Sequence, residues 1–204
     1  MTDLGGWLFR HRTAIPVPLA IAVLGLRIGE APRSNLLIGL GIGLTAIGEA
    51  LRLWAVHHIG AVSRTRSERL GPLIASGPFA RVRNPLYLGN IVLWAGFAVA
   101  ARLVWLAPLV VLLLAVEYHA IVRWEEQLLE KRLGDDYRTY TARVPRWWPR
   151  LNRAVRGDRG ENPHDANSTL SAVAFSWRDT LFSERGTLLA IAAGYAALWI
   201  KARF

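Results

Sequence analysis

Two adjacent carboxylates interrupt an apolar stripe in the middle of the chain. Within 119–133, Glu125 lies four residues from apolar positions on either side, and Glu126 lies at the edge of the same stripe. The stripe, which repeats at helical spacing, consists of Ile121, Val122, Leu128, Leu129 and Leu133. Charged runs usually face solvent, whereas carboxylates on an apolar face require a cationic or hydrogen-bonding partner. We therefore interpret Glu125 and Glu126 as a ligand-binding pair.

Two polar segments flank the apolar runs and can line a pocket with that pair. The segment 77–89 contains Gly77-Pro78 and Asn84-Pro85, which break helices and predict irregular backbone beside the cationic Arg83. Such backbone can hold a carboxylate or a ribose. The segment 134–149 combines tyrosines and arginines with a Trp pair typical of membrane interfaces. Its Tyr and Arg side chains either cap a pocket or dock the tail.

Ionisable residues inside apolar runs also require an explanation, because hydrocarbon disfavours charge. Glu49 and Arg52 are three residues apart on one helical face, so we expect them to form an ion pair. The pair is either structural or part of a substrate site. Glu117 comes at the end of its apolar run, where we expect its carboxylate to reach water.

The composition indicates the environment that positions these groups. The chain has 204 residues, 52% of them hydrophobic, with no Cys and a formal net charge of +10. The lack of Cys excludes a disulfide-stabilised module, a thiolate zinc site and a cysteine nucleophile. In a nucleic-acid-binding protein the basic residues lie on polar elements, whereas here they lie between long apolar runs. The sequence therefore predicts a membrane as partner, and no nucleic acid.

The apolar runs predict an all-α, polytopic integral-membrane helical bundle of about five transmembrane helices. Only Arg102 separates two of the runs, which predicts a tight helical hairpin, and 119–133 should continue the fourth run without a break. Gly39, Gly41 and Gly43 predict close helix packing. The five runs are 13–28, 35–56, 86–101, 103–118 and 187–200.

The positions of the Lys and Arg residues predict the topology. They concentrate in 57–85 and 119–186, which should face the cytoplasm together with the N-terminus. The stretch 152–170 is rich in Gly, Asn and mixed charge and reads as a linker. It divides the chain into a membrane core, 1–151, and a C-terminal appendage, 171–204, with a last transmembrane helix.

The ordered set of polar motifs resembles the isoprenylcysteine carboxyl methyltransferase family and is similar to the related phospholipid N-methyltransferases. The resemblance covers about 36–150. The family usually has His in its Arg-His-Pro-x-Tyr motif, whereas this chain has Asn84, which cannot act as a base. The motifs are Gly48-Glu49-x-x-Arg52, Gly77-Pro78-Phe79, Arg83-Asn84-Pro85-x-Tyr87-x-Gly89, Arg123-x-Glu125-Glu126, Gly134-x-x-Tyr137-x-x-Tyr140 and Arg143-Val144-Pro145.

The resemblance implies an integral-membrane methyltransferase with a cytosolic cofactor pocket for S-adenosylmethionine. Its methyl acceptor would be lipid-like, either a carboxylate or an amine. The expected catalytic residues are Glu49, Arg52 and Arg123, which would orient the acceptor or take its proton. No metal is expected, because nothing near His57 and His58 completes a ligand set. The expected cofactor-binding residues are Arg83, Asn84, Tyr87, Glu125, Glu126 and Tyr137.

Two other functions are compatible with part of the pattern. Membrane sterol reductases share its closing motifs and bind a nicotinamide cofactor, for which a basic diphosphate-binding cluster would be required. A non-catalytic membrane scaffold would leave the clustered polar residues unexplained. Titration with S-adenosylmethionine and with NADPH separates these alternatives.

Overall fold

The computed structural model describes residues 4–59, 73–149 and 176–203, and the regular structure in these ranges is entirely helical. The predicted all-α fold is confirmed for this part of the chain. Its elements are α1 (Leu4–His11), α2 (Pro16–Gly25), α3 (Asn35–Ile59), the 3-10 helix η2 (Gly77–Ala80), α4 (Pro85–Ala100), α5 (Leu106–Leu133), α6 (Asp135–Arg143) and α7 (Trp177–Lys201).

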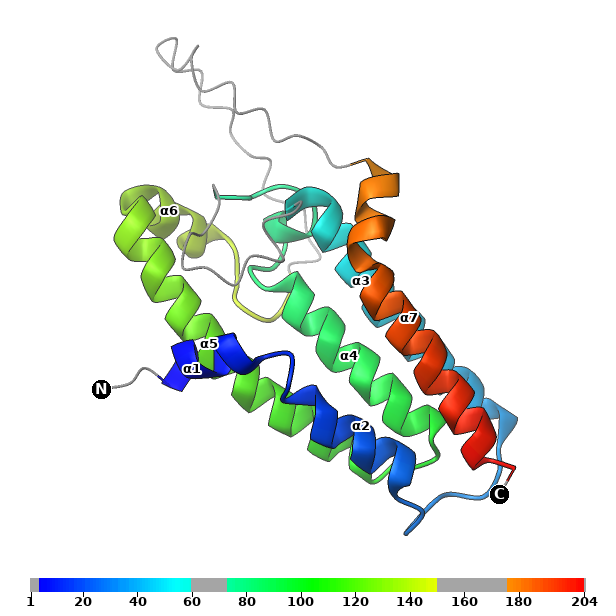
Figure 1. The fold of residues 1–204 in the computed structure, drawn as a ribbon. Helices are drawn as coiled ribbons and strands as arrows, with labels where there is room; N and C mark the ends of the chain where they lie inside the picture. The colour runs from blue at the N-terminus through cyan, green and yellow to red at the C-terminus, as the bar shows by residue number, and fades with distance from the viewer. Residues whose placement is uncertain (1–3, 60–72, 150–175, 204) are drawn as a thin grey trace.

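The long helices form an elongated bundle (Figure 1). Helix α3 packs along α4, α4 packs along α5, and α7 lies against α3, while α1 rests on α5. The α4–α5 connection is the tight hairpin that the sequence predicts, and Arg102 turns the chain there with φ 63°. Helix α5 runs unbroken to Leu133, as expected. It thus carries Glu125 and Glu126 beyond the apolar part of the bundle.

The backbones of α3 and α4 approach one another at glycines. A Cβ added to Gly48 would lie 2.6 Å from the Gly89 carbonyl oxygen and 2.6 Å from the Leu93 amide nitrogen. The sequence predicted such packing at Gly39, Gly41 and Gly43. Of these three, Gly41 packs closely, against Ala100 of α4. Nothing lies within 4 Å of a Cβ added at Gly39 or Gly43.

Two of the predicted runs differ from the observed helices. The run 13–28 yields only α2, ten residues long, because Pro16 and Pro18 confine the helix start and Gly29 has a positive φ of 70°. Ten residues of helix cover about 15 Å, half of a bilayer core. Helix α7 begins ten residues before the predicted run 187–200, because Ser176 caps it by accepting a hydrogen bond from the Asp179 amide at 3.2 Å.

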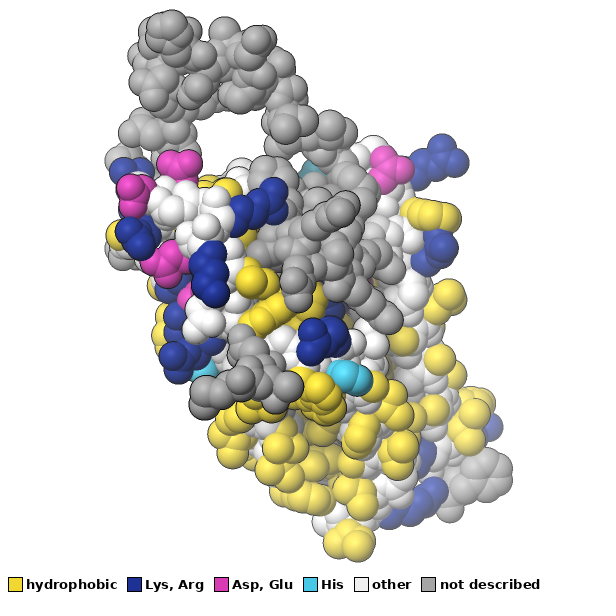
Figure 2. All heavy atoms as spheres, turned by 60° about the vertical axis from the view of Figure 1, so that its left-hand side comes forward, with side chains coloured by type: hydrophobic (Ala, Val, Ile, Leu, Met, Phe, Trp, Pro, Cys, Tyr) yellow, Lys and Arg dark blue, Asp and Glu magenta, His cyan; other side chains and the backbone are white. Residues whose placement is uncertain are grey.

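The outer surface of the bundle is apolar where the long helices are exposed. In the described residues, α3 and α5 are the two helices long and apolar enough to cross a membrane, and α2 and α4 are shorter apolar helices. Figure 2 shows hydrophobic side chains gathered over one part of the molecule and charged ones over the other. Apolar patches of this kind on a protein surface mark contact with a membrane or a partner. Side chains between 60% and 70% exposed include Leu36, Ile47, Leu112, Val116 and Leu189.

The close approach of α3 and α4 gives a first prediction. Gly48→Ala places a methyl group against the backbone of α4 and should lower the melting temperature in detergent, because the helices must separate. Gly43→Ala is the matched control on the same helix and should leave the melting temperature unchanged or higher, since its methyl group meets nothing. Equal melting temperatures for the two variants would contradict this account of the packing.

Candidate functional site

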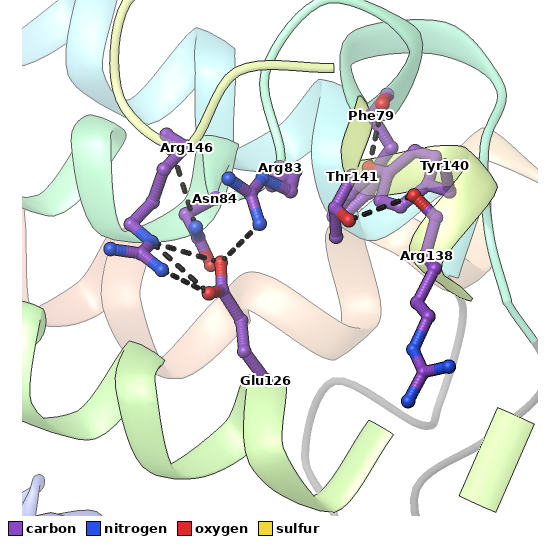
Figure 3. A network of polar contacts seen from close by, with 8 residues as sticks. All are labelled: Phe79, Arg83, Asn84, Glu126, Arg138, Tyr140, Thr141 and Arg146. Carbon is purple, nitrogen blue, oxygen red and sulfur yellow. Dashed lines mark hydrogen bonds and ion pairs between the residues drawn. The ribbon is translucent and has the colours of Figure 1, made fainter. Parts of the chain in front are cut away.

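A charged cleft lies at the end of the bundle where α5, α6 and the segments beside them meet. Its volume is about 300 Å³. Figure 3 shows Arg83 and Arg146 pointing at Glu126 from two different segments of the chain. The lining residues are Arg83, Arg123, Glu126, Gln127, Glu130, Tyr137, Arg138, Thr141 and Arg146.

Glu126 is the centre of this network. Its Oε1 lies 2.9 Å from Arg83 Nη1, and its Oε2 lies 2.5 Å from Arg146 Nη2. Arg146 Nε also donates to both carboxylate oxygens at 3.1 Å. The bonds to Glu126 raise the pKa of Arg146 above its ordinary value. Two guanidinium groups therefore share one carboxylate, which leaves this part of the cleft with a net positive charge.

Backbone contacts place both arginines. The Arg83 amide donates to the Pro145 carbonyl at 2.9 Å, and Asn84 Nδ2 donates to the Arg146 carbonyl at 3.3 Å. The Tyr140 hydroxyl donates to the Phe79 carbonyl at 2.8 Å. The first two bonds hold the segment after α6 against the segment before α4, and the third holds α6 itself against η2. Asn84 thus helps to dock a neighbouring segment through its side-chain amide.

Tyr137 forms a buried wall of the cleft. Burial raises the pKa of its hydroxyl to about 12, and the nearby Glu126 raises it further while Arg83 opposes the shift. Burial likewise raises the pKa of Tyr140. Both phenols therefore remain neutral in the fold, and Tyr137 is the one of the two that lines the cleft.

The two adjacent carboxylates of α5 face different surroundings. Glu125 accepts a hydrogen bond from the Tyr87 hydroxyl at 3.0 Å, and the Tyr87 ring packs against Tyr118 with centroids 4.8 Å apart. Neither Glu125 nor Tyr87 lines the cleft. Successive helical residues point about 100° apart, which explains the separation. Of the predicted pair, Glu126 therefore lines the cleft and Glu125 faces Tyr87.

A second polar cluster, the Arg52 cluster, lies between α3, α4 and α7. Arg52 Nε lies 3.2 Å from Glu49 Oε2, which confirms the predicted ion pair. Arg52 Nη1 donates to Asn90 on α4. On the other side, Nη2 lies 2.5 Å from Glu184 Oε2 and 3.3 Å from Thr187 Oγ1, both on α7. The carboxylate oxygen Glu49 Oε1 is buried with no hydrogen-bond partner.

Comparison with known protein families matches residues 36–136 to the phospholipid methyltransferase family. The matched segment, about half of the chain, belongs to this family. The matched phospholipid methyltransferase segment begins in α3 and ends in α6, so it contains Glu49, Arg52, Arg83, Glu126 and Asp136. Arg146 and the whole of α7 lie beyond it.

Two curated relatives extend the comparison. The chain is 28% identical to a nickel-cobalt-cadmium resistance protein of Alcaligenes xylosoxydans xylosoxydans, over 74% of this chain and 70% of that protein. It is 26% identical to a cobalt-zinc-cadmium resistance protein of Cupriavidus metallidurans, over 73% of this chain and 68% of that protein. No solved structure matches the chain. Within the described ranges, no three His, Cys, Asp or Glu side chains are arranged to hold a metal ion.

The residues predicted for the site fall into three places. Arg83, Arg123, Glu126 and Tyr137 line the cleft, and Asn84 lies beside it. Tyr87 and Glu125 bond to one another elsewhere, and Glu49 and Arg52 belong to the Arg52 cluster. Arg123 is exposed, so it meets the cleft from the solvent side.

Four polar side chains lie where sequence reasoning did not place them or did not consider them. Glu117, expected to reach water, is 8% exposed, and its Oε1 has no partner. Arg146 follows the Arg143-Val144-Pro145 motif directly, a signal that could have included it. Asn90 lies one turn after the Asn-Pro motif. Glu184 gave no such signal, because it lies among other charged residues in the first turns of α7.

The raised pKa of Tyr137 predicts an alkaline loss of stability. The folded state holds this proton to about pH 12, whereas the unfolded chain releases it from about pH 10. The stabilisation is therefore complete below pH 10 and is lost as the pH rises through this window. Tyr137→Phe should lose less unfolding free energy than the unaltered chain between about pH 9 and pH 11, measured by denaturant titration in detergent. Parallel losses would show that Tyr137 ionises freely in the fold.

Proposed function

We propose that the chain is an S-adenosylmethionine-dependent methyltransferase that methylates a lipid-like acceptor held in the membrane. The match of residues 36–136 to the phospholipid methyltransferase family carries the proposal. The geometry supports it, because the polar side chains of that segment gather in a cleft and in the adjoining helical bundle. The acceptor is a carboxylate or an amine.

The cleft has the chemistry that this cofactor requires. S-adenosylmethionine would supply an activated methyl group on a sulfonium, and it also carries a carboxylate, an ammonium and an adenine. Arg83 Nε is a buried donor with no partner, which suits the carboxylate. Glu126 and Glu130 offer acceptors for the ammonium, and the Tyr137 ring offers an apolar wall for the base. The residues therefore fit the cofactor.

The Arg52 cluster suits the acceptor side. It lies among apolar helices, about two turns of α3 before Ile59, where a lipid-like molecule would be buried. Arg52 can orient a carboxylate acceptor, and the unpartnered Glu49 Oε1 can accept a proton from an amine. Catalysis would then rest mainly on positioning and on the exclusion of water.

We further propose a multi-pass arrangement with both the N-terminus and the cleft on the cytoplasmic side. The elements that would cross or enter the bilayer are α2, α3, α4, α5 and α7. Basic side chains near the cleft support this orientation, since cytoplasmic segments carry the excess of Lys and Arg. They include Arg81, Arg83, Arg123, Lys131, Arg132, Arg138, Arg143 and Arg146.

Cofactor binding tests the proposed function directly. We expect the purified chain to bind S-adenosylmethionine in the micromolar range, which corresponds to a binding free energy of about −8 kcal/mol. We expect no binding of NADPH. Arg83→Gln should weaken binding by about 1.5–3 kcal/mol, because a charge-assisted bond is lost. Arg132→Gln, an exposed arginine on α5 that does not line the cleft, is the matched control and should bind normally. Binding of NADPH alone would favour the reductase alternative.

Cysteine labelling tests the orientation, because the chain has no cysteine of its own. Thr139→Cys on α6 should react only with reagent supplied on the cytoplasmic side. Asn35→Cys at the start of α3 should react only from the opposite side, and both positions are exposed. Reaction of both positions from the same side would contradict the arrangement.

A further inference from the structure

Helix α7 lies outside the family segment and yet contacts α3 along its length. At one end, the Trp177 ring stacks on His57 with centroids 4.2 Å apart and an interplanar angle of 9°. In the middle, Glu184 reaches Arg52. Further along, the Tyr195 hydroxyl lies 2.7 Å from Thr45 Oγ1. Through these contacts α7 packs directly against the family segment (Figure 1).

The far end of α7 is held as well. Lys201 Nζ lies 2.9 Å from Glu30 Oε1, and Glu30 also pairs with Arg102 in the hairpin between α4 and α5. The Lys201 ammonium also donates to the Val23 carbonyl at 3.2 Å. The helix therefore cannot slide or rotate without breaking contacts at both ends. These contacts fix the position of Glu184 along the bundle axis relative to Arg52.

Arg52 depends on α7 for one side of its guanidinium. Glu49 and Asn90 engage Nε and Nη1, whereas Nη2 bonds to Glu184 and Thr187. A planar guanidinium is fixed in direction only when its edges are bound from different sides. Without Glu184, the side chain keeps its partners on α3 and α4, but on α7 it retains only the longer bond to Thr187. Glu184 is buried, with 4% of its side chain exposed, so water does not replace it.

We propose that Glu184 is a positioning residue of the acceptor site, which it serves by holding Arg52 in the orientation that receives the acceptor. The proposal rests on the proposed function and adds a residue from a helix beyond the family segment. The site is then completed by two parts of the chain, α3–α4 and α7. Glu184 acts through Arg52 and does not itself touch the transferred group.

Three variants of the full chain test this role. Glu184→Gln removes the charge, and Glu184→Asp keeps it but withdraws it by one methylene. Tyr195→Phe removes a different α7–α3 hydrogen bond and is the control for simple docking of the helix. Each variant is assayed for binding of S-adenosylmethionine, for melting temperature, and for transfer of labelled methyl from S-adenosylmethionine into vesicles of the polar lipids extracted from the producing cells.

A positioning role predicts a specific pattern. Both Glu184 variants should lose about tenfold to a hundredfold in kcat, because a small misplacement of an orienting group is costly. Their affinity for S-adenosylmethionine should stay within about twofold of the unaltered chain. Glu184→Asp should melt close to the unaltered chain, and Tyr195→Phe should retain normal turnover per folded molecule.

The opposite results overturn the proposal. If Glu184→Gln and Glu184→Asp keep normal kcat, or lose turnover only in proportion to their folded fraction as Tyr195→Phe does, Glu184 is merely structural. Should Glu184→Gln fail to fold, normal kcat in Glu184→Asp alone decides against the role. If the unaltered chain binds no S-adenosylmethionine and transfers no methyl group, the proposed function fails, and this inference falls with it.

Discussion

A guanidinium group among apolar helices must be neutralised where it lies, and the arrangement of α3, α4 and α7 follows from that requirement. Arg52 is bound by a carboxylate three residues earlier on its own helix, by an amide on α4 and by a carboxylate and a hydroxyl on α7. Removing one partner of a buried ion pair is strongly unfavourable, because a charge is left uncompensated. The three helices are therefore held in register by one side chain as well as by apolar packing.

The charged cleft is built on a different principle, in which backbone contacts place the charges. The Arg83 amide and the Asn84 side chain both bind the segment after α6, and the Tyr140 hydroxyl ties α6 itself to η2. Residues distant in the sequence thus deliver two arginines to one carboxylate. Burial keeps the Tyr137 hydroxyl protonated and neutral. The charge in the cleft therefore comes from its acidic and basic side chains.

Local patterns in the sequence predicted the parts of this protein that local chemistry determines. The i,i+3 spacing of Glu49 and Arg52, the hairpin at Arg102 and the unbroken helix through Glu126 could all be predicted, because each depends on neighbours within a few turns. The division between Glu125 and Glu126 could not, since it depends on which helix lies opposite each face. Glu184 was out of reach because no local pattern connects α7 with α3. The polar first turns of α7 also hid its true beginning, which depends on the Ser176 cap.

The glycine contact between α3 and α4 limits where a lipid could enter the helical bundle. With Gly48 against Gly89 and Leu93, and Gly96 against Thr45, the two backbones touch over several turns. An acyl chain cannot pass through such a seam, because small residues at helix interfaces bring the backbones into direct contact and leave no space for hydrocarbon. The interface between α3 and α4 therefore leaves no lateral opening. A lipid-like molecule would have to enter the bundle between other helices.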